Sequence, residues 1–251
     1  MKRIAFVTGA SSGIGEATAR RLAKDGCAII LVARRRDRLA ALARELPTPS
    51  HVVALDVRDG AAVRAAIDDL PPDFRDVDVL VNNAGLSLGL DPAPSASLDD
   101  WDTMIATNVT ALVHVTRALL PGMVARDRGH VVQLGSVAGS YPYPGGNVYG
   151  ATKAFVSQFS LNLRADLVGS RVRVTSIEPG MVETDFSRVR FGGDEARAKA
   201  VYAGFQPLSA TDIAEAIAWC VAQPPHVNVN RLELMPVMQA FGAFAVKRSP
   251  A

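Results

Sequence analysis

The residues with the clearest chemical potential are a tyrosine and a lysine spaced for one face of a helix. Tyr149 and Lys153 are four residues apart in a stretch whose apolar residues recur at helical spacing, so phenol and ammonium lie on one side. A free phenol titrates at about 10 and needs a neighbouring cation to act as a base at neutral pH, and Lys153 can supply that cation. Ser136 ends a strand-like run thirteen residues before Tyr149. Its hydroxyl is expected at the carboxyl edge of a sheet, where α/β folds bind ligands.

A glycine-rich stretch near the start has the features of a phosphate-binding loop. It follows a strand-like run, opens a helix-like one, and reads Thr8-Gly9-Ala10-Ser11-Ser12-Gly13-Ile14-Gly15. Glycines allow a tight turn and close backbone approach, and N–H groups at a helix start hold a pyrophosphate. Three glycines alone also fit an ordinary turn, but the flanking strand and helix favour a dinucleotide site.

The end of the second strand-like run indicates which dinucleotide is bound. Ala33 occupies the place where an NAD-specific site needs an acid, and Arg34 and Arg35 follow it. Guanidinium groups can fork onto a 2′-phosphate, so NADP is the predicted cofactor. The alternative is a solvated charge run, although cations at a helix start oppose the helix dipole. Asp37, the nearby acid, is expected to cap the next helix.

These side chains require a sheet with helices on both faces to position them. The strand-like runs are mostly continuous apolar segments, as expected for a covered parallel sheet, and they are Arg3–Thr8, Ala28–Ala33, His51–Leu55, Val77–Val81, His130–Leu134, Arg171–Ile177 and Leu232–Leu234. Helical patterns lie between them. We therefore predict one doubly wound Rossmann-type α/β domain over residues 1–251, with about seven parallel strands. Residues 183–207 are expected to form a long irregular substrate loop.

Length and composition limit the other possibilities. A chain of 251 residues suits one large domain, and a net charge of +2 does not indicate a nucleic-acid groove or a membrane-binding surface. Cys27 and Cys220 lie in apolar stretches and are expected to be core residues. The N-terminal apolar run, Ile4–Val7, is too short for the core of a signal peptide, and the longest plain apolar run, Cys27–Ala33, is too short for a membrane span. A cytoplasmic protein is the expectation.

Two other enzyme classes can be set aside from the sequence. A serine hydrolase elbow needs a glycine two residues before its serine, and Leu134 stands there. A metal enzyme needs clustered ligands, whereas the four histidines are scattered at His51, His114, His130 and His226. No metal is expected.

Taken together, these motifs resemble the short-chain dehydrogenase/reductase family. The matching residues follow the family's order and spacing, and they are Thr8-Gly9-x-x-x-Gly13-x-Gly15, Asn82-Asn83-Ala84-Gly85, Asn108, Ser136, Tyr149-x-x-x-Lys153 and Pro179-Gly180. Asn108 also stands out alone, because an amide within an apolar helical stripe requires partners. Further stretches, such as Asn228–Val237, resemble the NADP-dependent 3-hydroxy acid (serine or allo-threonine) dehydrogenases within this family.

The resemblance implies a role for each matching residue. Tyr149 would be the acid/base, Ser136 would orient the substrate oxygen, Lys153 would hold the nicotinamide ribose, and Asn108 would support a water relay. Other positions would contact the cofactor, namely Asp56 and Val57 at the adenine, Asn83, Ala84 and Gly85 at the adjacent ribose, and Pro179, Gly180, Val182 and Thr184 at the carboxamide. A homotetramer is also implied. Apolar residues on more than one face of Trp101–Val124 and Tyr149–Leu167 fit that assembly, with the tail near Met235–Phe244 at its contacts.

The substrate is predicted to be a small molecule, a short 3-hydroxy acid. The alternatives are a 3-oxoacyl carrier-protein reductase or other short-chain carbonyl reductase, and a non-catalytic NADP-binding regulator. A carboxylate is gripped best by an arginine, and Arg190 lies between two apolar residues in the expected loop. Arg188 or the backbone near Gly145 and Gly146 could serve instead, and both arginines could also be solvated loop charges.

Overall fold

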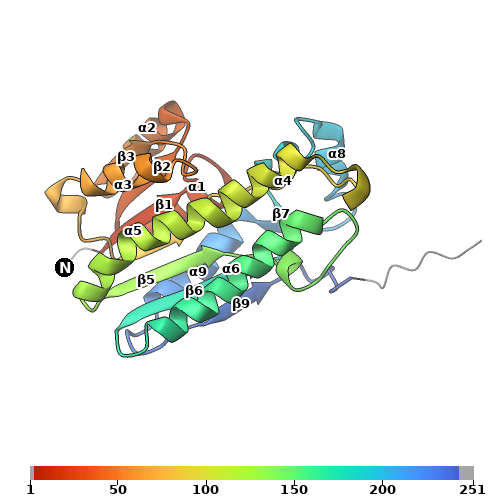
Figure 1. The fold of residues 1–251 in the computed structure, drawn as a ribbon. Coiled ribbons are helices and arrows are strands. Elements are labelled where there is room, and N and C mark those ends of the chain that lie inside the picture. Colours follow the sequence, from red (N-terminus) through yellow and green to blue (C-terminus); the bar gives the residue numbers. More distant parts are fainter. Residues whose placement is uncertain (1–2, 243–251) are drawn as a thin grey trace, which may run out of the picture.

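Seven parallel strands form the centre of the fold, which a computed structural model describes for residues 3–242 (Figure 1). Their order across the sheet is β3-β2-β1-β4-β5-β6-β9, and every neighbouring pair is parallel. The strands are β1 (Ile4–Thr8), β2 (Ala28–Ala33), β3 (Ser50–Ala54), β4 (Val79–Asn82), β5 (Gly129–Leu134), β6 (Val172–Pro179) and β9 (Arg231–Leu234). The predicted doubly wound sheet is confirmed.

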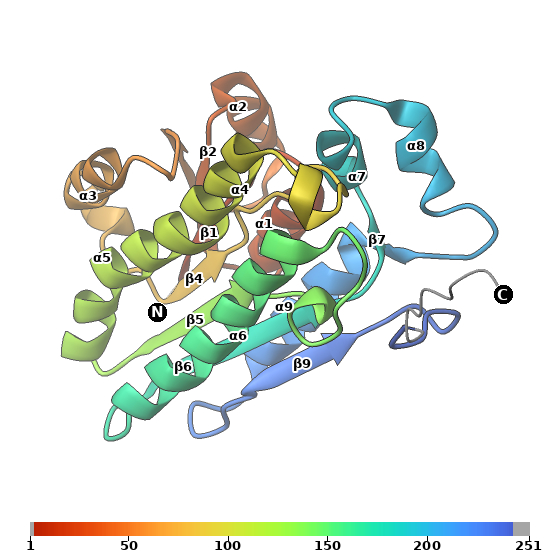
Figure 2. The ribbon, with the colours of Figure 1, turned by 45° about the vertical axis from the view of Figure 1, so that its right-hand side comes forward.

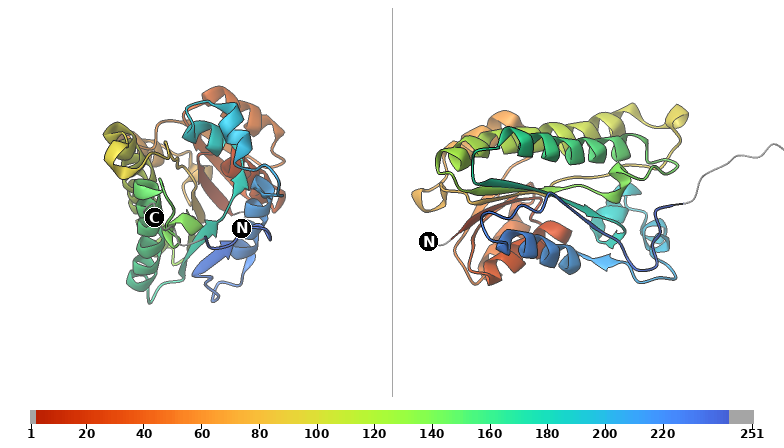
Figure 3. Two further views of the ribbon diagram at one scale, coloured as in Figure 1. Left: turned by 90° about the vertical axis from the view of Figure 1, so that its right-hand side faces the viewer. Right: turned by 90° about the horizontal axis from the view of Figure 1, so that it is seen from below.

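Helices cover both faces of this sheet, as the edge-on view in Figure 3 shows. One layer contains α1 (Gly13–Lys24), α2 (Arg36–Glu45) and α9 (Ala210–Ala222), and the other contains α3 (Gly60–Asp68), α5 (Leu112–Ala125) and α6 (Asn147–Asp166). A π-helix (Ala106–Ala111) joins α4 (Leu98–Ile105) to α5. Each layer buries its own apolar cluster against the strands, which explains why the strand sequences are continuously apolar.

The strand order reverses between β1 and β4. From β1 the sheet continues through β2 and β3 on one side, and from β4 through β5 and β6 on the other. Chains leaving β1 and β4 therefore diverge and leave a crevice at the carboxyl ends of these strands, which is where open α/β sheets bind ligands.

A small substructure stands beyond these carboxyl ends (Figure 2). It contains α7 (Asp185–Arg190) and α8 (Glu195–Ala200), and a two-stranded parallel pair, β7 (Val182–Glu183) with β8 (Leu208–Ser209), closes it. The expectation of an irregular segment over 183–207 is therefore wrong in part. Thr184 and Asp194 cap the two helices by accepting backbone hydrogen bonds, which is a local signal sufficient to start a short helix.

The beginning of α2 also differs from the prediction. Its N-cap is Arg35, which makes no side-chain capping bond, and Asp37 lies inside the first turn. Asp37 therefore does not cap the helix; its carboxylate complements the positive end of the helix dipole instead.

The continuous helical stretch Leu98–Ala125 is long and apolar enough to cross a membrane, judged by length and composition alone. Its apolar residues are accounted for in part by packing, since Val115, Leu119 and Met123 belong to the core beneath the sheet. Cys27 and Cys220 are both buried, as predicted.

Candidate active site

One cavity of about 780 Å³ opens at the crevice and brings together most of the residues selected from the sequence. The cofactor candidates that line it are Gly9, Ser11, Ser12, Gly13, Ile14, Arg34, Arg35, Asp56, Val57, Asn83, Ala84, Gly85, Pro179, Gly180, Val182 and Thr184. Ser136, Tyr149, Lys153 and Arg190 line it as well. Gly15 and Asn108 are not in the lining and lie behind it. The cavity has room for a dinucleotide and a small substrate.

The glycine-rich loop forms a cradle that side chains would fill. A Cβ on Gly9 would lie 2.7 Å from the Asn83 amide nitrogen, and one on Gly15 would lie 2.3 Å from the Gly9 carbonyl oxygen. Gly9 and Gly13 also have φ angles of +67° and +56°, which favour glycine. The loop leads directly into the twelve-residue α1, so its first N–H groups face the cavity end. The residues present thus fit a bound pyrophosphate.

The loop is held in place by polar contacts from β4. The Thr8 hydroxyl accepts hydrogen bonds from the backbone N–H groups of Asn83 and Ala84 at 3.0 and 2.9 Å. The Asn83 amide donates in return to the Thr8 carbonyl at 2.9 Å. These contacts fix the two sides of the crevice relative to each other.

Arg35 contacts the same loop. Its guanidinium donates to the hydroxyls of Ser11 and Ser12, both at 2.8 Å. Burial lowers the pKa of this guanidinium, and Arg38 adds to that effect. The Arg34 and Arg35 side chains therefore concentrate positive charge beside the phosphate loop, which suits a 2′-phosphate. Asp56 faces this end of the cavity too, and its pKa is lowered by hydrogen bonds from Arg58.

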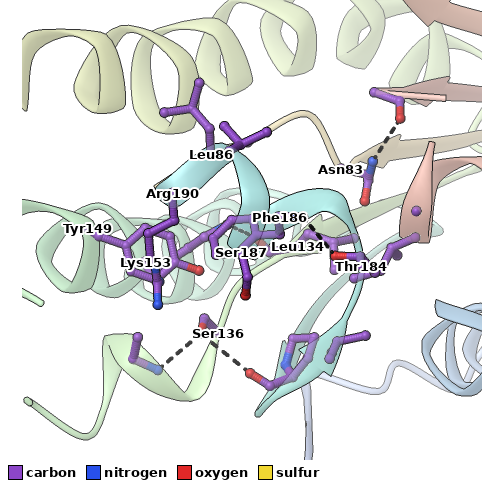
Figure 4. A pocket seen from close by; sticks show the side chains of 18 of the residues that line it. Asn83, Leu86, Leu134, Ser136, Tyr149, Lys153, Thr184, Phe186, Ser187 and Arg190 are labelled. Carbon is purple, nitrogen blue, oxygen red and sulfur yellow. Dashed lines mark hydrogen bonds between the residues drawn. The ribbon is translucent and has the colours of Figure 1, made fainter. Parts of the chain in front are cut away.

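Ser136, Tyr149 and Lys153 meet at the other end of the cavity (Figure 4). Ser136 lies two residues beyond β5 and caps a short 3-10 helix by accepting from the Ala138 N–H at 3.1 Å. Tyr149 and Lys153 project from the first turns of α6. The Lys153 ammonium donates to the Leu134 carbonyl at 2.7 Å and lies 5.9 Å from the centre of the Tyr149 ring.

The protonation equilibria of this group are shifted by burial. Burial raises the pKa of the Tyr149 phenol to about 12, although Arg190 and a hydrogen bond with Ser136 act in the opposite direction. Burial lowers the pKa of the Lys153 ammonium to about 8. At neutral pH the lysine is mostly a cation and the phenol a proton donor.

Asn108 lies behind the cavity within the π-helix and is 1% exposed. Its amide exchanges two hydrogen bonds with the backbone of Leu86, accepting from the N–H at 2.9 Å and donating to the carbonyl at 2.8 Å. It also donates to the Thr152 hydroxyl at 3.1 Å. The buried amide therefore has its required partners, and it connects the chain after β4 to α6 beside Lys153.

Arg190 lies at the end of α7 and reaches over the phenol. Its guanidinium carbon is 5.3 Å from the centre of the Tyr149 ring and 5.1 Å from that of Phe186, as Figure 4 shows. Its Nε donates to the hydroxyl of Ser87 at 3.1 Å, and Nη2 donates to that of Tyr143 at 3.4 Å. Arg190 is thus held beside the acid–base group with donor capacity remaining, an arrangement that fits a substrate anion.

The other carboxylate candidates lie elsewhere. Arg188 is exposed, forms an ion pair with Asp185 at 3.5 Å, and is outside the cavity lining. Gly145 packs against the Leu90 carbonyl. Neither it nor Gly146 lines the cavity.

Some residues in or beside the cavity were not identified from the sequence. Ser87 and Tyr143 hold Arg190 although they are 103 and 47 residues away in the chain. Gln239 accepts from the Met181 N–H at 2.8 Å and closes the cavity beside Gly180. No local pattern marks such residues, because their importance comes from contacts between distant segments.

Comparisons with known proteins identify one family. The family model described as short chain dehydrogenase matches residues 3–193. An NADP-dependent 3-hydroxy acid dehydrogenase of Salmonella typhi is 55% identical over 247 residues, covering 98% of this chain and all of that protein. A serine 3-dehydrogenase of Agrobacterium fabrum is 54% identical, with 97% of each chain covered.

A solved structure is also close. The closed form of a serine dehydrogenase complexed with NADP⁺ superposes with a TM-score of 0.96 at 51% identity, covering 98% of this chain and all of that one. The glycine-rich cradle, the Ser136–Tyr149–Lys153 group and these similarities together assign the chain to a family. It belongs to the short-chain dehydrogenases.

Proposed function

We propose that the protein is an NADP-dependent dehydrogenase that interconverts the β-hydroxyl and β-oxo groups of short 3-hydroxy acids, of the serine, allo-threonine or 3-hydroxypropionate type. The observation that carries the proposal is the position of Arg190, which lies over the Tyr149 ring inside the cavity. A molecule that offers a hydroxyl to the phenol can therefore offer a carboxylate to the guanidinium. The names of the relatives, 3-hydroxy acid dehydrogenase and serine dehydrogenase, support it.

Tyr149 moves the proton in this proposal. In the oxidative direction its phenolate accepts the proton of the substrate hydroxyl, and in the reductive direction the phenol returns it. The Tyr149 side chain is buried, so cations must stabilise the phenolate. Among the described residues, the Arg190 guanidinium and the protonated Lys153 ammonium are the cations that lie within 6 Å of the centre of that ring.

Ser136 orients the substrate oxygen, and Lys153 and Asn108 support the reacting group from behind. Ser136 is near enough to lower the pKa of the Tyr149 phenol, so one substrate oxygen atom can contact both hydroxyls. Lys153 would hold the cofactor ribose, because its ammonium faces the cavity beside Gly85. Asn108 fixes the Leu86 backbone through two hydrogen bonds, next to Gly85 and the Lys153 ammonium.

The phosphate cradle and the arginines beside it would hold NADP. When bound, NADP supplies the hydride acceptor for oxidation and the hydride donor for reduction. The α1 N–H groups would contact the pyrophosphate, and Arg34 and Arg35 the 2′-phosphate. Asp56 and Val57 would meet the adenine, and Asn83, Ala84 and Gly85 the adjacent ribose. Pro179, Gly180, Val182 and Thr184 would face the carboxamide.

We extend the proposal to domain organisation, assembly and location. One catalytic domain over residues 1–251 fits the single sheet, although residues 1–2 and 243–251 lie outside the described part. A homotetramer is supported by exposed apolar side chains on the predicted contact helices, such as Ile105, Leu161 and Phe155, the last of which stacks on the half-buried Phe159. The predicted contact tail near Met235–Phe244 is described only to residue 242. A chain with only two cysteines, both of them buried, fits a cytoplasmic protein.

A substrate panel tests the proposed function. Absorbance of NADPH at about 340 nm would be followed with serine, allo-threonine, 3-hydroxypropionate, 3-hydroxyisobutyrate, malonic semialdehyde and an acyl thioester. We expect turnover with the acids, and a Tyr149→Phe variant should lose about 10² to 10⁴ in kcat while still binding NADP. Preference for the thioester would favour a carrier-protein reductase. Normal turnover by Tyr149→Phe would remove Tyr149 as the acid/base.

A further inference from the structure

A buried carboxylate lies directly behind the segment that carries Ser136. Glu178, in β6, is 1% exposed. Its Oε1 accepts hydrogen bonds from the hydroxyls of Ser157 and Ser176, each at 2.9 Å. Its Oε2 is paired with the guanidinium of Arg231 in β9. An interior carboxylate is costly unless it is paired and hydrogen-bonded, and the chemistry proposed above makes no direct use of this one.

The first contact of Glu178 leads to the catalytic helix. Ser157 lies on α6 four residues after Lys153, so its hydroxyl is one turn further along the helix that also carries Tyr149. The hydrogen bond from Ser157 therefore ties this helix to the end of β6. A change at Glu178 would alter the height of α6 above the sheet.

The second contact leads to the segment of Ser136. The Arg231 group that pairs with Glu178 also donates to the hydroxyl of Ser140, at the end of the short 3-10 helix that Ser136 caps. Glu178 itself precedes Pro179, whose carbonyl accepts from the Ser136 hydroxyl at 3.4 Å. The ion pair therefore contacts the chain on both sides of the Ser136 hydroxyl, at Ser140 and next to Pro179.

The backbone before Ser136 also lies against the carboxylate. A Cβ added to Gly135 would come within 2.9 Å of the Glu178 Cγ and 3.0 Å of the Ser176 hydroxyl oxygen. Glycine is therefore required for this close approach. Any displacement of the Glu178 side chain would act directly on the chain one residue before Ser136.

A second carboxylate makes the arginine necessary. Glu233 is the register partner of Glu178 on the neighbouring strand, and like charges directly opposite each other repel. Arg231 lies 3.6 Å from Glu233 as well as pairing with Glu178. The other oxygen of Glu233 accepts from the Tyr141 hydroxyl at 3.3 Å, and Tyr141 lines the cavity. Without Arg231, the carboxylates of Glu178 and Glu233 would repel each other. A displacement of Glu233 would then move Tyr141 in the cavity wall.

We infer that Glu178 and Arg231 are a positioning pair that sets the Ser136 hydroxyl relative to Tyr149 and Lys153. The inference rests on the proposed dehydrogenase function, in which Ser136 orients the substrate oxygen. The pair does not touch substrate or cofactor. It joins the three segments that carry the reacting groups, namely the chain after β5, the first turns of α6 and the chain after β6.

The test compares Arg231→Met with a matched control, Arg128→Met. Arg128 is 47% exposed and pairs at 2.6 Å with Asp78, whose side chain is 4% exposed; the corresponding values for Arg231 and Glu178 are 42% and 1%. Asp78 precedes β4 and accepts from the Ile4 N–H, so this second pair lies at the opposite, amino-terminal edge of the sheet. Both substitutions strand a buried carboxylate, but only one of them is beside Ser136.

We expect Arg231→Met to lower kcat by at least about tenfold, because displacements of about 1 Å in a reacting group can cost about 10²-fold. The KM for NADP and the Kd for NADPH, measured by fluorescence titration without substrate, should change less than about twofold. Arg128→Met should lose a similar amount of thermal stability and keep its kcat. Arg231→Lys should recover part of the kcat, and Glu178→Gln should resemble Arg231→Met.

Equal losses of melting temperature with full kcat in both methionine variants would overturn the inference and leave the pair with a structural role only. A raised NADPH Kd with unchanged kcat would overturn it too. If Arg231→Met does not fold, Arg231→Lys and Glu178→Gln carry the test by the same criteria. If the wild type and all variants are equally active, only this inference is excluded. If the wild type is inactive on every hydroxy acid, the proposed function is excluded and the inference with it.

Discussion

Lys153 should lower the free energy of unfolding of the ligand-free protein, although the active site requires it. Burial lowers the pKa of its ammonium from 10.5 to about 8. Between these two values the unfolded chain binds a proton that the folded chain does not, so the free energy of unfolding rises with pH across this window. A difference of 2.5 pKa units corresponds to about 3 kcal/mol. Below about pH 8 this cost is present in full, and it disappears as the pH rises to 10.5.

Replacing Lys153 by Met removes the titrating group and keeps most of the apolar stem. At pH 7 the variant should gain up to about 3 kcal/mol, reduced by about 1 kcal/mol for the lost hydrogen bond to the Leu134 carbonyl. The advantage over wild type should shrink between pH 8 and 10.5 and then become a loss.

Urea denaturation of both proteins without NADP, from pH 7 to 10.5, measures this difference. Subtracting one curve from the other cancels the titration of groups that the two proteins share. A difference in stability that stays constant across the window would show that burial does not lower the lysine pKa, and would refute the reasoning. Activity of the variant should be lost at every pH, because one of the two cations beside Tyr149 and the group proposed to hold the cofactor ribose are gone.

Three further predictions concern binding and assembly. Substituting Arg34 and Arg35 together by Ala should raise the KM for NADP by about two orders of magnitude or more, from about 1.5 kcal/mol or more for each charge-assisted contact. The KM for NAD should rise far less, and equal effects on both cofactors would exclude recognition of the 2′-phosphate. Arg190→Ala should cost about 3 kcal/mol in kcat/KM for a 3-hydroxy acid and little for an uncharged alcohol of equal size, and parallel losses would move the carboxylate contact elsewhere. Sedimentation at micromolar concentration should give a mass well above the 26.6 kDa of one chain, and a monomer would contradict the proposed tetramer.

The sheet and the reacting group could be predicted because each depends on a local pattern. Strands buried on both faces must be apolar along their whole length, and Tyr149 and Lys153 share a face through helical spacing alone. The two short helices in 183–207 were missed because neither has a long apolar stripe, although Thr184 and Asp194 are good capping residues. The capping role of Asp37 was wrong because the chain turns into α2 two residues earlier, at Arg35.

Contacts between distant segments could not be predicted in this way. Ser87 and Arg190 meet across 103 residues, and the pairing of Glu178 with Arg231 depends on β6 and β9 being neighbours in the sheet. Neither follows from spacing in the sequence, because the three-dimensional arrangement of the strands decides which side chains meet.

The π-helix at Ala106–Ala111 makes this part of the protein sensitive to length more than to composition. A π-turn accommodates one residue more than an α-turn does, and each α-helical residue advances about 100° around the axis. Deleting one residue from this segment would let α4 and α5 merge into an unbroken α-helix, with its hydrogen bonds intact. Asn108 would then be rotated away from Leu86 and Thr152. A single-residue deletion here would therefore act as an active-site mutation even though every side chain of the site is still encoded.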